Sequence, residues 1–302
     1  MKTRDLTDLL LLAAIWGSSF LFMRLAVPAF GPTALAFVRV AGAALVLLPI
    51  LLLRGEGPVL RANWKPMIVL GLTNSALPFL LFGYALVTLP AALAAIFNAA
   101  TPLFTALIAW AWLGDPLDRW RSLGLALGFA GVVGLALVKS LATGSLGSLQ
   151  FDIPSALAIL ACLLGTLMYG HAASHAKRYL KGVPSMAMAA GTQAAAALAL
   201  ALPAALTWPA AMPGLRDWLC AAALAVLASA LAYILYFRLI SRVGPTGASS
   251  VTFLVPVFAA AWGWLFLGET VTLPMALGGG VILAGTALVL GLWPRRPAVA
   301  GA

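Results

Sequence analysis

Charged side chains are scarce in this sequence. Of 302 residues only 9% are Asp, Glu, Lys or Arg, whereas 63% are hydrophobic, and the mean hydropathy is +1.06. A water-soluble domain carries roughly 25% charged residues, because its surface has to be solvated. The scarcity therefore excludes a soluble fold and indicates a polytopic membrane protein whose outer surface faces lipid.

Cysteine and the common catalytic patterns are also nearly absent. Cys162 and Cys220 both fall within apolar runs, so disulfides do not contribute to the fold. No Gly-x4-Gly-Lys-Ser/Thr loop is present, which excludes direct use of ATP. His171 and His175 have the spacing of a helical metal pair, but no carboxylate or thiol completes the set. We therefore expect neither a metal nor any other cofactor.

What the sequence does contain is a series of long apolar runs. Each is long enough to cross a hydrocarbon core of ~30 Å as a helix. None shows the ~10-residue alternation of an outer-membrane strand. We therefore expect an all-α integral membrane protein with ten transmembrane helices. The runs are 8–27, 33–53, 66–87, 91–113, 119–139, 153–173, 184–207, 216–238, 246–267 and 272–293.

The chain matches itself when it is shifted by 154 positions. Positions 75–131 align with 229–285 without a gap and share fifteen identities in 57 positions, Pro102 with Pro256 among them. An odd number of helices per copy places the second copy upside down, so we expect a 5+5 inverted repeat around a central cavity, with the substrate site near the membrane midplane. The predicted parts are a first repeat at 1–140, a linker at 141–151, a second, inverted repeat at 152–294 and a tail at 295–302.

The net charge of +10 is a topology signal and does not indicate nucleic-acid binding. With the N-terminus inside, fourteen Lys and Arg residues fall at inner loops and membrane ends and three at outer ones, with Arg39 left within the second span. This asymmetry follows the positive-inside rule. We expect both termini to be cytoplasmic, in a bacterial inner membrane, with the lipid bilayer as the surrounding partner and no nucleic acid.

Two groups of residues carry a resemblance to a known family. One is Trp16-Gly17-Ser18-Ser19-Phe20, followed by Gly31-Pro32 and by Arg39 in the next helix. The other is the Leu-Gly-Asp/Glu ending at 113–115 and 267–269. Over nearly the whole chain the sequence resembles the EamA family of the drug/metabolite transporter superfamily, and within it the YddG-type aromatic amino-acid exporters. The resemblance implies a ten-helix carrier that exports amino acids or related metabolites from a central cavity.

Arg39 is the most informative single charge. It is the seventh residue of the second apolar run, too deep for ordinary anchoring at the interface. Its guanidinium can hold a substrate carboxylate in a two-pronged bond. The alternative is structural, since a long side chain near a helix end can extend to the interface or bond to backbone carbonyls.

Further polar and aromatic side chains in mid-span are candidates for the cavity wall. Each also has a packing interpretation, because rings at helical spacing commonly pack and amides bridge helices. We expect the following residues to line the cavity together with Arg39: Trp16, Ser19, Phe20, Asn74, Phe79, Asn98, Thr101, Tyr169, His171, Gln193, Tyr233 and Thr252.

Three prolines and two glycine-rich helices suggest where the bundle bends and packs. Pro78, Pro102 and Pro256 each remove a backbone hydrogen bond within a span, so we expect hinge or gating points there. The glycine-rich helices at 119–139 and 272–293 are predicted to pack closely, within the chain or at a dimer contact. We expect a monomer or a weak homodimer.

The inferred cavity favours small amphipathic solutes. We expect a secondary transporter that exports aromatic or other neutral amino acids, or related metabolites, by alternating access. All eight acids fall at helix ends or in loops and His171 is the one evident proton carrier, so facilitated movement is the hypothesis. A multidrug or quaternary-cation exporter is the alternative, because cations stack on aromatic rings. A membrane transferase would need clustered acids, and the one close pair, Asp115 and Asp118, is interpreted as loop caps, so we expect no enzyme.

Reporter fusions test the predicted orientation. A fluorescent protein at the C-terminus should fold and fluoresce, and alkaline phosphatase there should be inactive. The phosphatase inserted between positions 144 and 148 of the linker should be active instead. Termini on opposite sides of the membrane would contradict the ten-span arrangement.

Overall fold

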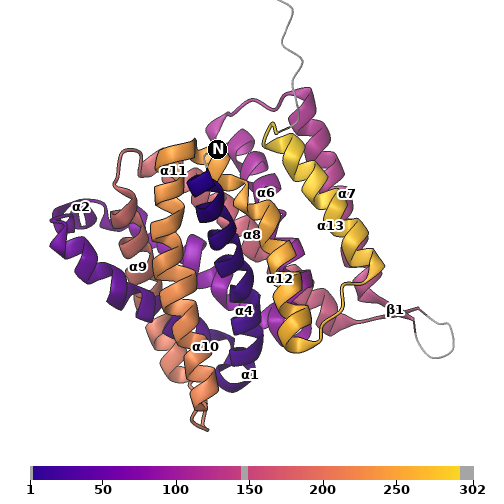
Figure 1. The fold of residues 1–302 in the computed structure, drawn as a ribbon, viewed down its shortest axis with the longest axis horizontal. Coiled ribbons are helices and arrows are strands. Elements are labelled where there is room, and N and C mark those ends of the chain that lie inside the picture. Colours follow the sequence, from indigo (N-terminus) through magenta and orange to yellow (C-terminus); the bar gives the residue numbers. More distant parts are fainter. Residues whose placement is uncertain (1–2, 144–148, 293–302) are drawn as a thin grey trace, which may run out of the picture.

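A computed structural model describes residues 3–143 and 149–292 of the chain. These residues form a bundle of helices from which one short hairpin projects (Figure 1). The bundle begins with α1 (Thr3–Leu53), which runs through the positions of the first two predicted spans. The chain then continues through α2 (Gly57–Ala62), α3 (Trp64–Gly71), η1 (Leu72–Ala76), α4 (Leu77–Thr88), α5 (Ala91–Asn98), α6 (Thr101–Ile108), η2 (Ala109–Leu113) and α7 (Arg119–Ser140).

The second half follows the hairpin of β1 (Leu141–Thr143) and β2 (Leu149–Phe151). These strands pair antiparallel, with Leu141 opposite Phe151, and they occupy the predicted linker. The remaining elements are α8 (Ile153–Tyr179), α9 (Ser185–Leu206), α10 (Leu215–Ala225), η3 (Val226–Leu231), α11 (Ala232–Ser249), α12 (Val251–Leu267) and α13 (Leu273–Val289).

These elements make ten membrane spans. Seven helical stretches of the described residues are long and apolar enough to cross a bilayer, and the 51-residue α1 is one of them. It bends at Gly31, whose φ of 73° and ψ of 161° are not helical, and so supplies two spans. The apolar α12 and α13 add two more with 17 residues each, a length of roughly 26 Å. The expected all-α membrane fold is confirmed.

Some boundaries differ from the sequence-based expectation. No long loop separates the first two spans, because the chain passes from one helix to the next at Gly31, whose backbone angles are not helical. The sixth span continues to Tyr179, six residues beyond its predicted end. The ninth span begins at Val251, because α11 continues to Ser249.

The duplication is visible in the backbone as well as in the sequence. The two π-helical turns, η1 and η3, begin at Leu72 and Val226, which are 154 positions apart. The fourth and ninth spans both end on a glycine with left-handed backbone, Gly114 with φ 72° and Gly268 with φ 65°. A residue without a Cβ is favoured at such a helix end. The fold is therefore two copies of one five-helix unit.

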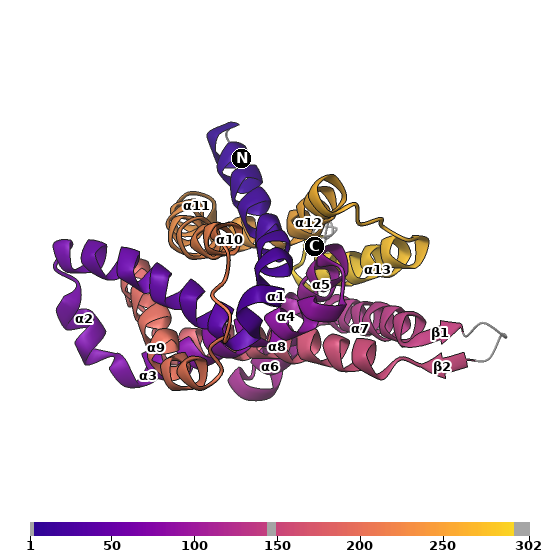
Figure 2. The same ribbon diagram turned by 90° about the horizontal axis from the view of Figure 1, so that it is seen from below.

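The glycine-rich helices α7 and α13 lie side by side next to the hairpin (Figure 2). A Cβ added to Gly285 would lie 2.5 Å from the backbone nitrogen of Gly128 and 2.6 Å from the carbonyl oxygen of Gly124. The small-residue face predicted for packing is thus used within the chain, where it brings the last helix of each repeat into backbone contact.

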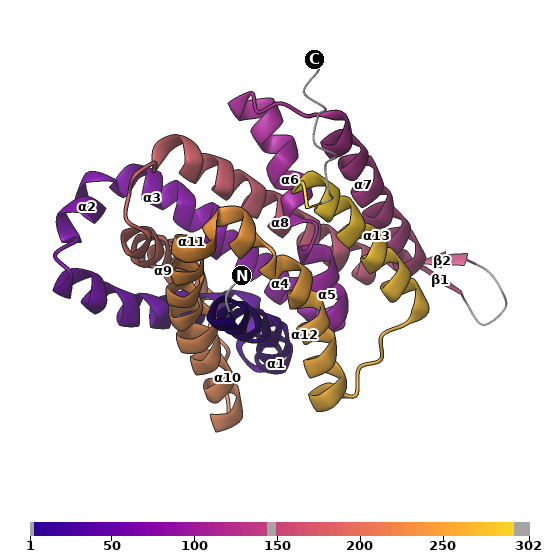
Figure 3. The same ribbon diagram turned by 45° about the horizontal axis from the view of Figure 1, so that its top comes forward.

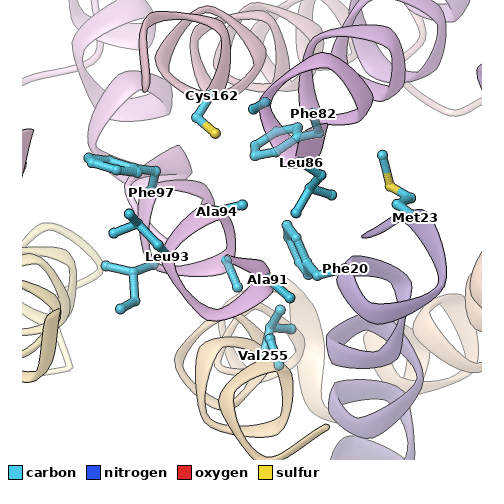
Figure 4. Close-up of a cluster of buried hydrophobic side chains, with 14 of the residues drawn as sticks. Phe20, Met23, Phe82, Leu86, Ala91, Leu93, Ala94, Phe97, Cys162 and Val255 are labelled. Carbon is cyan, nitrogen blue, oxygen red and sulfur yellow. The ribbon is translucent and has the colours of Figure 1, made fainter. Parts of the chain in front are cut away.

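A buried apolar cluster surrounds α5 (Figure 4). All residues of this half-helix except Asn98 are buried. Phe20 of α1, Phe82 of α4 and Val255 of α12 pack around it. The cluster therefore lies against the start of α5, directly below the turn that follows α4.

The start of α1 lies between α11 and α12 (Figure 3). Asp8 holds it there through ion pairs with Arg238 at 2.6 Å and Arg242 at 3.1 Å. We call this end of the bundle the N-terminal face, and the opposite end, from which the β1–β2 hairpin projects, the hairpin face. The end of α13 also lies at the N-terminal face (Figure 1).

The close contact of α7 and α13 predicts a strong effect of a single methyl group. Gly285→Ala should lower the free energy of unfolding by about 1–3 kcal/mol, because backbone atoms cannot move aside for the new Cβ. Gly280→Ala on the same helix is the matched control, since nothing lies within 4 Å of its Cβ position. Equal thermal stability of the two purified variants in detergent would contradict this packing.

Candidate functional site

A cavity of about 530 Å³ lies between the two repeats. It extends from Val255 and Phe20 at the α5 cluster to Asp115, Arg121 and Leu290 at the N-terminal face. No residue of the hairpin face is among those that line it in the described part of the chain. The cavity therefore reaches one face of the bundle, and the packed α5 half-helix closes it toward the other.

Most of the predicted lining residues meet in this cavity. The structure brings eleven of the thirteen together, from both repeats. They are Trp16, Ser19, Phe20, Arg39, Asn74, Phe79, Asn98, Thr101, Tyr169, Tyr233 and Thr252. Their role in binding a substrate stays a prediction.

Two predicted residues lie elsewhere. His171 stacks on Trp112, with ring centroids 5.2 Å apart and an angle of 12° between the planes. Its ring is also 5.8 Å from that of His175, which in turn is 4.8 Å from Tyr179. Gln193 is fully buried between helices. Neither residue lines the cavity.

Of the three predicted hinge prolines, Pro102 alone lines the cavity. It follows the break between α5 and α6, where Ala99 and Ala100 form a turn. Pro78 stands at the start of α4 directly after η1, and Pro256 lies inside an uninterrupted α12. Any movement at these points is a prediction.

Arg39 is a buried cation at the cavity wall. Its side chain comes from the second half of α1, and the residue is 6% exposed. Nε donates to the hydroxyl of Ser229 at 3.1 Å, and the guanidinium carbon lies 3.7 Å from the ring centroid of Phe79. Nη1 lies 3.4 Å from the sulfur of Met23. No carboxylate within the described ranges pairs with Arg39.

The serine that holds Arg39 has a counterpart in the other repeat. Gln193 Nε2 donates to the Ser75 hydroxyl at 3.1 Å. Gln193 stands 154 positions after Arg39, and Ser229 stands 154 positions after Ser75. The two contacts are therefore related by the offset of the duplication. Both serines lie on the π-helical turns η1 and η3, and both are buried. Duplication thus produced two equivalent contacts, of which one carries a charge and reaches the cavity.

Aromatic rings form much of the remaining wall. Trp16 lies 5.2 Å from Tyr236, and Phe82 packs edge-to-face with Phe20 at 5.9 Å. Phe82 also stacks with Tyr169 at 6.3 Å. These rings offer apolar faces to a ligand in the same cavity that holds the guanidinium.

Uncharged polar groups complete the wall. Asn74 Nδ2 donates to the hydroxyl of Tyr233 at 2.9 Å and so joins the two repeats. Thr101 donates to the carbonyl of Asn98 at 2.7 Å, across the α5–α6 break. The Asn98 side-chain amide itself makes no hydrogen bond within the described residues, which leaves it free to bind a ligand.

Several lining residues stand outside the set of thirteen, and some of them had a detectable signal in the sequence. Met23 and Thr105 follow Phe20 and Thr101 at helical spacing, so their faces were predictable. Asp115 and Arg121 had no such signal, because they belong to a loop and to a helix start at the cavity mouth.

A second cavity, of about 540 Å³, lies at the hairpin face. It is bounded by the start of α5, the end of α7 and the loop between α12 and α13, and includes Lys139 and Glu269. It has no aromatic wall among the described residues and does not lie between the repeats near mid-depth. The central cavity is therefore the better candidate site.

Two inverted five-helix repeats around a polar and aromatic cavity at membrane depth define the class of secondary membrane carriers. The EamA-like transporter family matches this chain over residues 7–137 and 156–291. The chain belongs to that family, and it is a transporter and not an enzyme.

The relatives agree with this class. The chain is 32% identical over 300 residues to the "Uncharacterized inner membrane transporter YedA" of Escherichia coli strain K12, covering 95% of this chain and 91% of that protein. It is 27% identical over 294 residues to a "Probable terminal-alkyne amino-acid exporter" of Streptantibioticus cattleyicolor, covering 93% and 91%. A solved crystal structure that is 20% identical has the same fold, with a TM-score of 0.66 over 97% of this chain and 98% of that one.

The paired serine contacts predict matched losses of stability. Ser229→Ala and Ser75→Ala should each lower the free energy of unfolding by about 1 kcal/mol, because each leaves a buried donor without its partner. Ser18→Ala is the control, since that hydroxyl bonds the carbonyl of Ile15 in its own helix. Unfolding of the purified variants in detergent measures the difference, and stability equal to Ser18→Ala in both would contradict the two contacts.

Proposed function

We propose that this carrier exports amino acids, chiefly aromatic or other neutral ones, across a bacterial inner membrane by facilitated alternating access, with both termini cytoplasmic. The observation that supports the substrate class is Arg39, a cation in the central cavity that pairs with no carboxylate of the described residues. A substrate carboxylate is the simplest partner for it, since two parallel N–H···O bonds match the guanidinium fork.

The rest of the cavity suits the remainder of such a substrate. The rings of Trp16, Phe82 and Tyr169 offer an apolar surface for a sizeable side chain. The Asn98 amide and the Thr101 hydroxyl can accept from an ammonium group. The volume of about 530 Å³ lies within the range of small-molecule pockets.

The similarity to a distant relative that is named as an amino-acid exporter supports the same substrate class. That relative is named for a terminal-alkyne amino acid, and it matches over 93% of this chain at 27% identity. An organic cation fits less well than a zwitterion, because the guanidinium repels it and Asp115, the one lining acid in the described part of the chain, lies at the mouth.

The distribution of titratable groups supports a facilitated mechanism. Among the residues that the structure describes, Asp115 at the mouth is the one acid that lines the central cavity, and His171 stands outside it. A pH step imposed on liposomes without a solute gradient should therefore drive no net movement of amino acid. Net uptake in response to that step would contradict facilitation and would leave the substrate class standing.

Counterflow in liposomes tests the role of Arg39. Arg39→Gln should reduce exchange of labelled phenylalanine at least about tenfold, because it removes a charge-assisted hydrogen bond at the substrate. Arg39→Lys should retain part of the exchange, since it keeps the charge and loses the fork. Arg54→Gln, an exposed cation outside the cavity, is the control.

Phenylalanine amide separates recognition from folding. The wild-type protein should prefer the acid over the amide, and Arg39→Gln should lose that preference whatever its overall rate. Unchanged preference in a folded Arg39→Gln protein would contradict the carboxylate assignment. Exchange of a quaternary ammonium ion in place of amino acids would favour the multidrug alternative.

A further inference from the structure

An acid stands at the same place in each repeat, at opposite faces of the bundle. Glu269 follows Gly268 at the end of the ninth span, and Asp115 follows Gly114 at the end of the fourth. Their positions differ by 154, the offset of the duplication. In each case a cation of the repeat's first span approaches the acid, Arg24 of α1 on one face and Lys177 of α8 on the other.

At the hairpin face the pair joins separate elements. Arg24 Nε lies 3.9 Å from Glu269 Oε1, and Glu269 Oε2 accepts from the backbone N–H of Ala91 at 2.8 Å. Arg24 Nη1 donates to the carbonyl of Leu86 and, at 2.7 Å, to that of Val87. The pair therefore attaches to both sides of the turn between α4 and α5, directly over the cluster that closes the cavity.

At the N-terminal face the equivalent pair is not attached in this way. Lys177 Nζ lies 2.9 and 2.6 Å from the two carboxylate oxygens of Asp115, and within the described ranges Asp115 accepts from no backbone N–H. The Asp115 side chain is 38% exposed, against 15% for Glu269. Asp115 also lines the cavity mouth, whereas Glu269 does not line the central cavity.

We propose that these pairs are the two gates of the carrier, one per repeat, and that they hold opposite faces closed in turn. In the present state Arg24 and Glu269 hold the α4–α5 turn and close the hairpin face. Asp115 and Lys177 pair with each other at the cavity mouth, and the N-terminal face is open. The proposal rests on the alternating-access part of the proposed function and is independent of the substrate.

The same duplication predicts the other state. Residues 86–91, which contact the hairpin-face pair, correspond to residues 240–245 in α11. Closing the N-terminal face would bring Asp115 and Lys177 against that end of α11, while Arg24 and Glu269 release the α4–α5 turn. Arg242 lies within this segment and Arg238 two residues before it. Both are now paired with Asp8, and they give this part of α11 a charge complementary to Asp115.

Sided labelling of one reporter cysteine tests the gates without any substrate. The background is Cys162→Ala with Cys220→Ala, and Thr105→Cys in the cavity wall is the reporter. A membrane-impermeant maleimide is applied at the hairpin face in one preparation of vesicles and at the N-terminal face in the other. Glu269→Gln should raise labelling from the hairpin face about fivefold and lower it from the N-terminal face. A larger fraction of molecules open at the hairpin face leaves a smaller fraction open at the N-terminal face.

A matched acid controls for loss of charge at that face. Asp217 also lies there and accepts a backbone N–H, that of Gly214 at 3.0 Å, outside the proposed gate. Asp217→Asn should leave labelling within about twofold of the parent. Adding Asp115→Asn to Glu269→Gln should reverse the gain, since it weakens the gate of the other face.

Three outcomes would overturn the proposal. One is a Glu269→Gln protein that labels from the hairpin face no faster than Asp217→Asn. Another is labelling that rises from both faces together, which marks a loosened fold. The third is an Asp115→Asn addition without effect. If the labelling follows the prediction and the protein exchanges no amino acid, the gates are supported and the proposed substrate class alone is contradicted.

Discussion

Holding a guanidinium inside an apolar bilayer is the constraint on which this structure depends. A charge at that depth costs about 2.5–3.5 kcal/mol even on permissive scales. Arg39 offsets this cost with the Ser229 hydroxyl, the face of Phe79 and a cavity at its open side. Charge-assisted hydrogen bonds and desolvated cation–π contacts are each worth about 2 kcal/mol, which is the same order. The charge is thus tolerated without a carboxylate partner among the described residues, and the proposed substrate carboxylate would take that place.

Duplication explains how the chain built this site. Two copies of one unit, inverted, supply equivalent contacts at each level: Ser75 with Gln193 and Ser229 with Arg39 at mid-depth, and an acid with a cation at each face. Function requires that the copies differ. At mid-depth the difference is chemical, a charge in place of an amide. At the two faces it is conformational, because one acid holds the neighbouring turn and the other is exposed at the cavity mouth.

Much of this fold was predictable because a membrane imposes simple rules. Apolar length defined the ten spans, the 154-residue offset defined the repeat, and helical spacing placed Trp16, Ser19 and Phe20 on one face of the first span. Features that depend on the backbone angles of a single residue could not be predicted from these rules. Gly31 bends α1 without a loop, and α11 continues past the predicted start of the ninth span. Neither changes the composition of the segment.

The residues that line the candidate site were more predictable than the contacts that these residues make. Eleven of the thirteen expected residues meet in one cavity, because polar groups in a span must turn away from lipid. The same rule does not distinguish a cavity from a contact between helices, so Gln193 satisfies it by bonding Ser75. His171 satisfies it by stacking on Trp112. The partner of Glu269 at Ala91 lies 178 positions away and is a backbone group, which no side-chain pattern reveals.

The most direct test of the central claim is an electron cryo-microscopy structure of the carrier with phenylalanine bound. The account predicts density in the central cavity with its carboxylate about 2.7–2.9 Å from the terminal nitrogens of Arg39 and its ring against Trp16 or Phe82. Ligand density in which the carboxylate faces away from Arg39, or a protein side chain occupying that position, would contradict it.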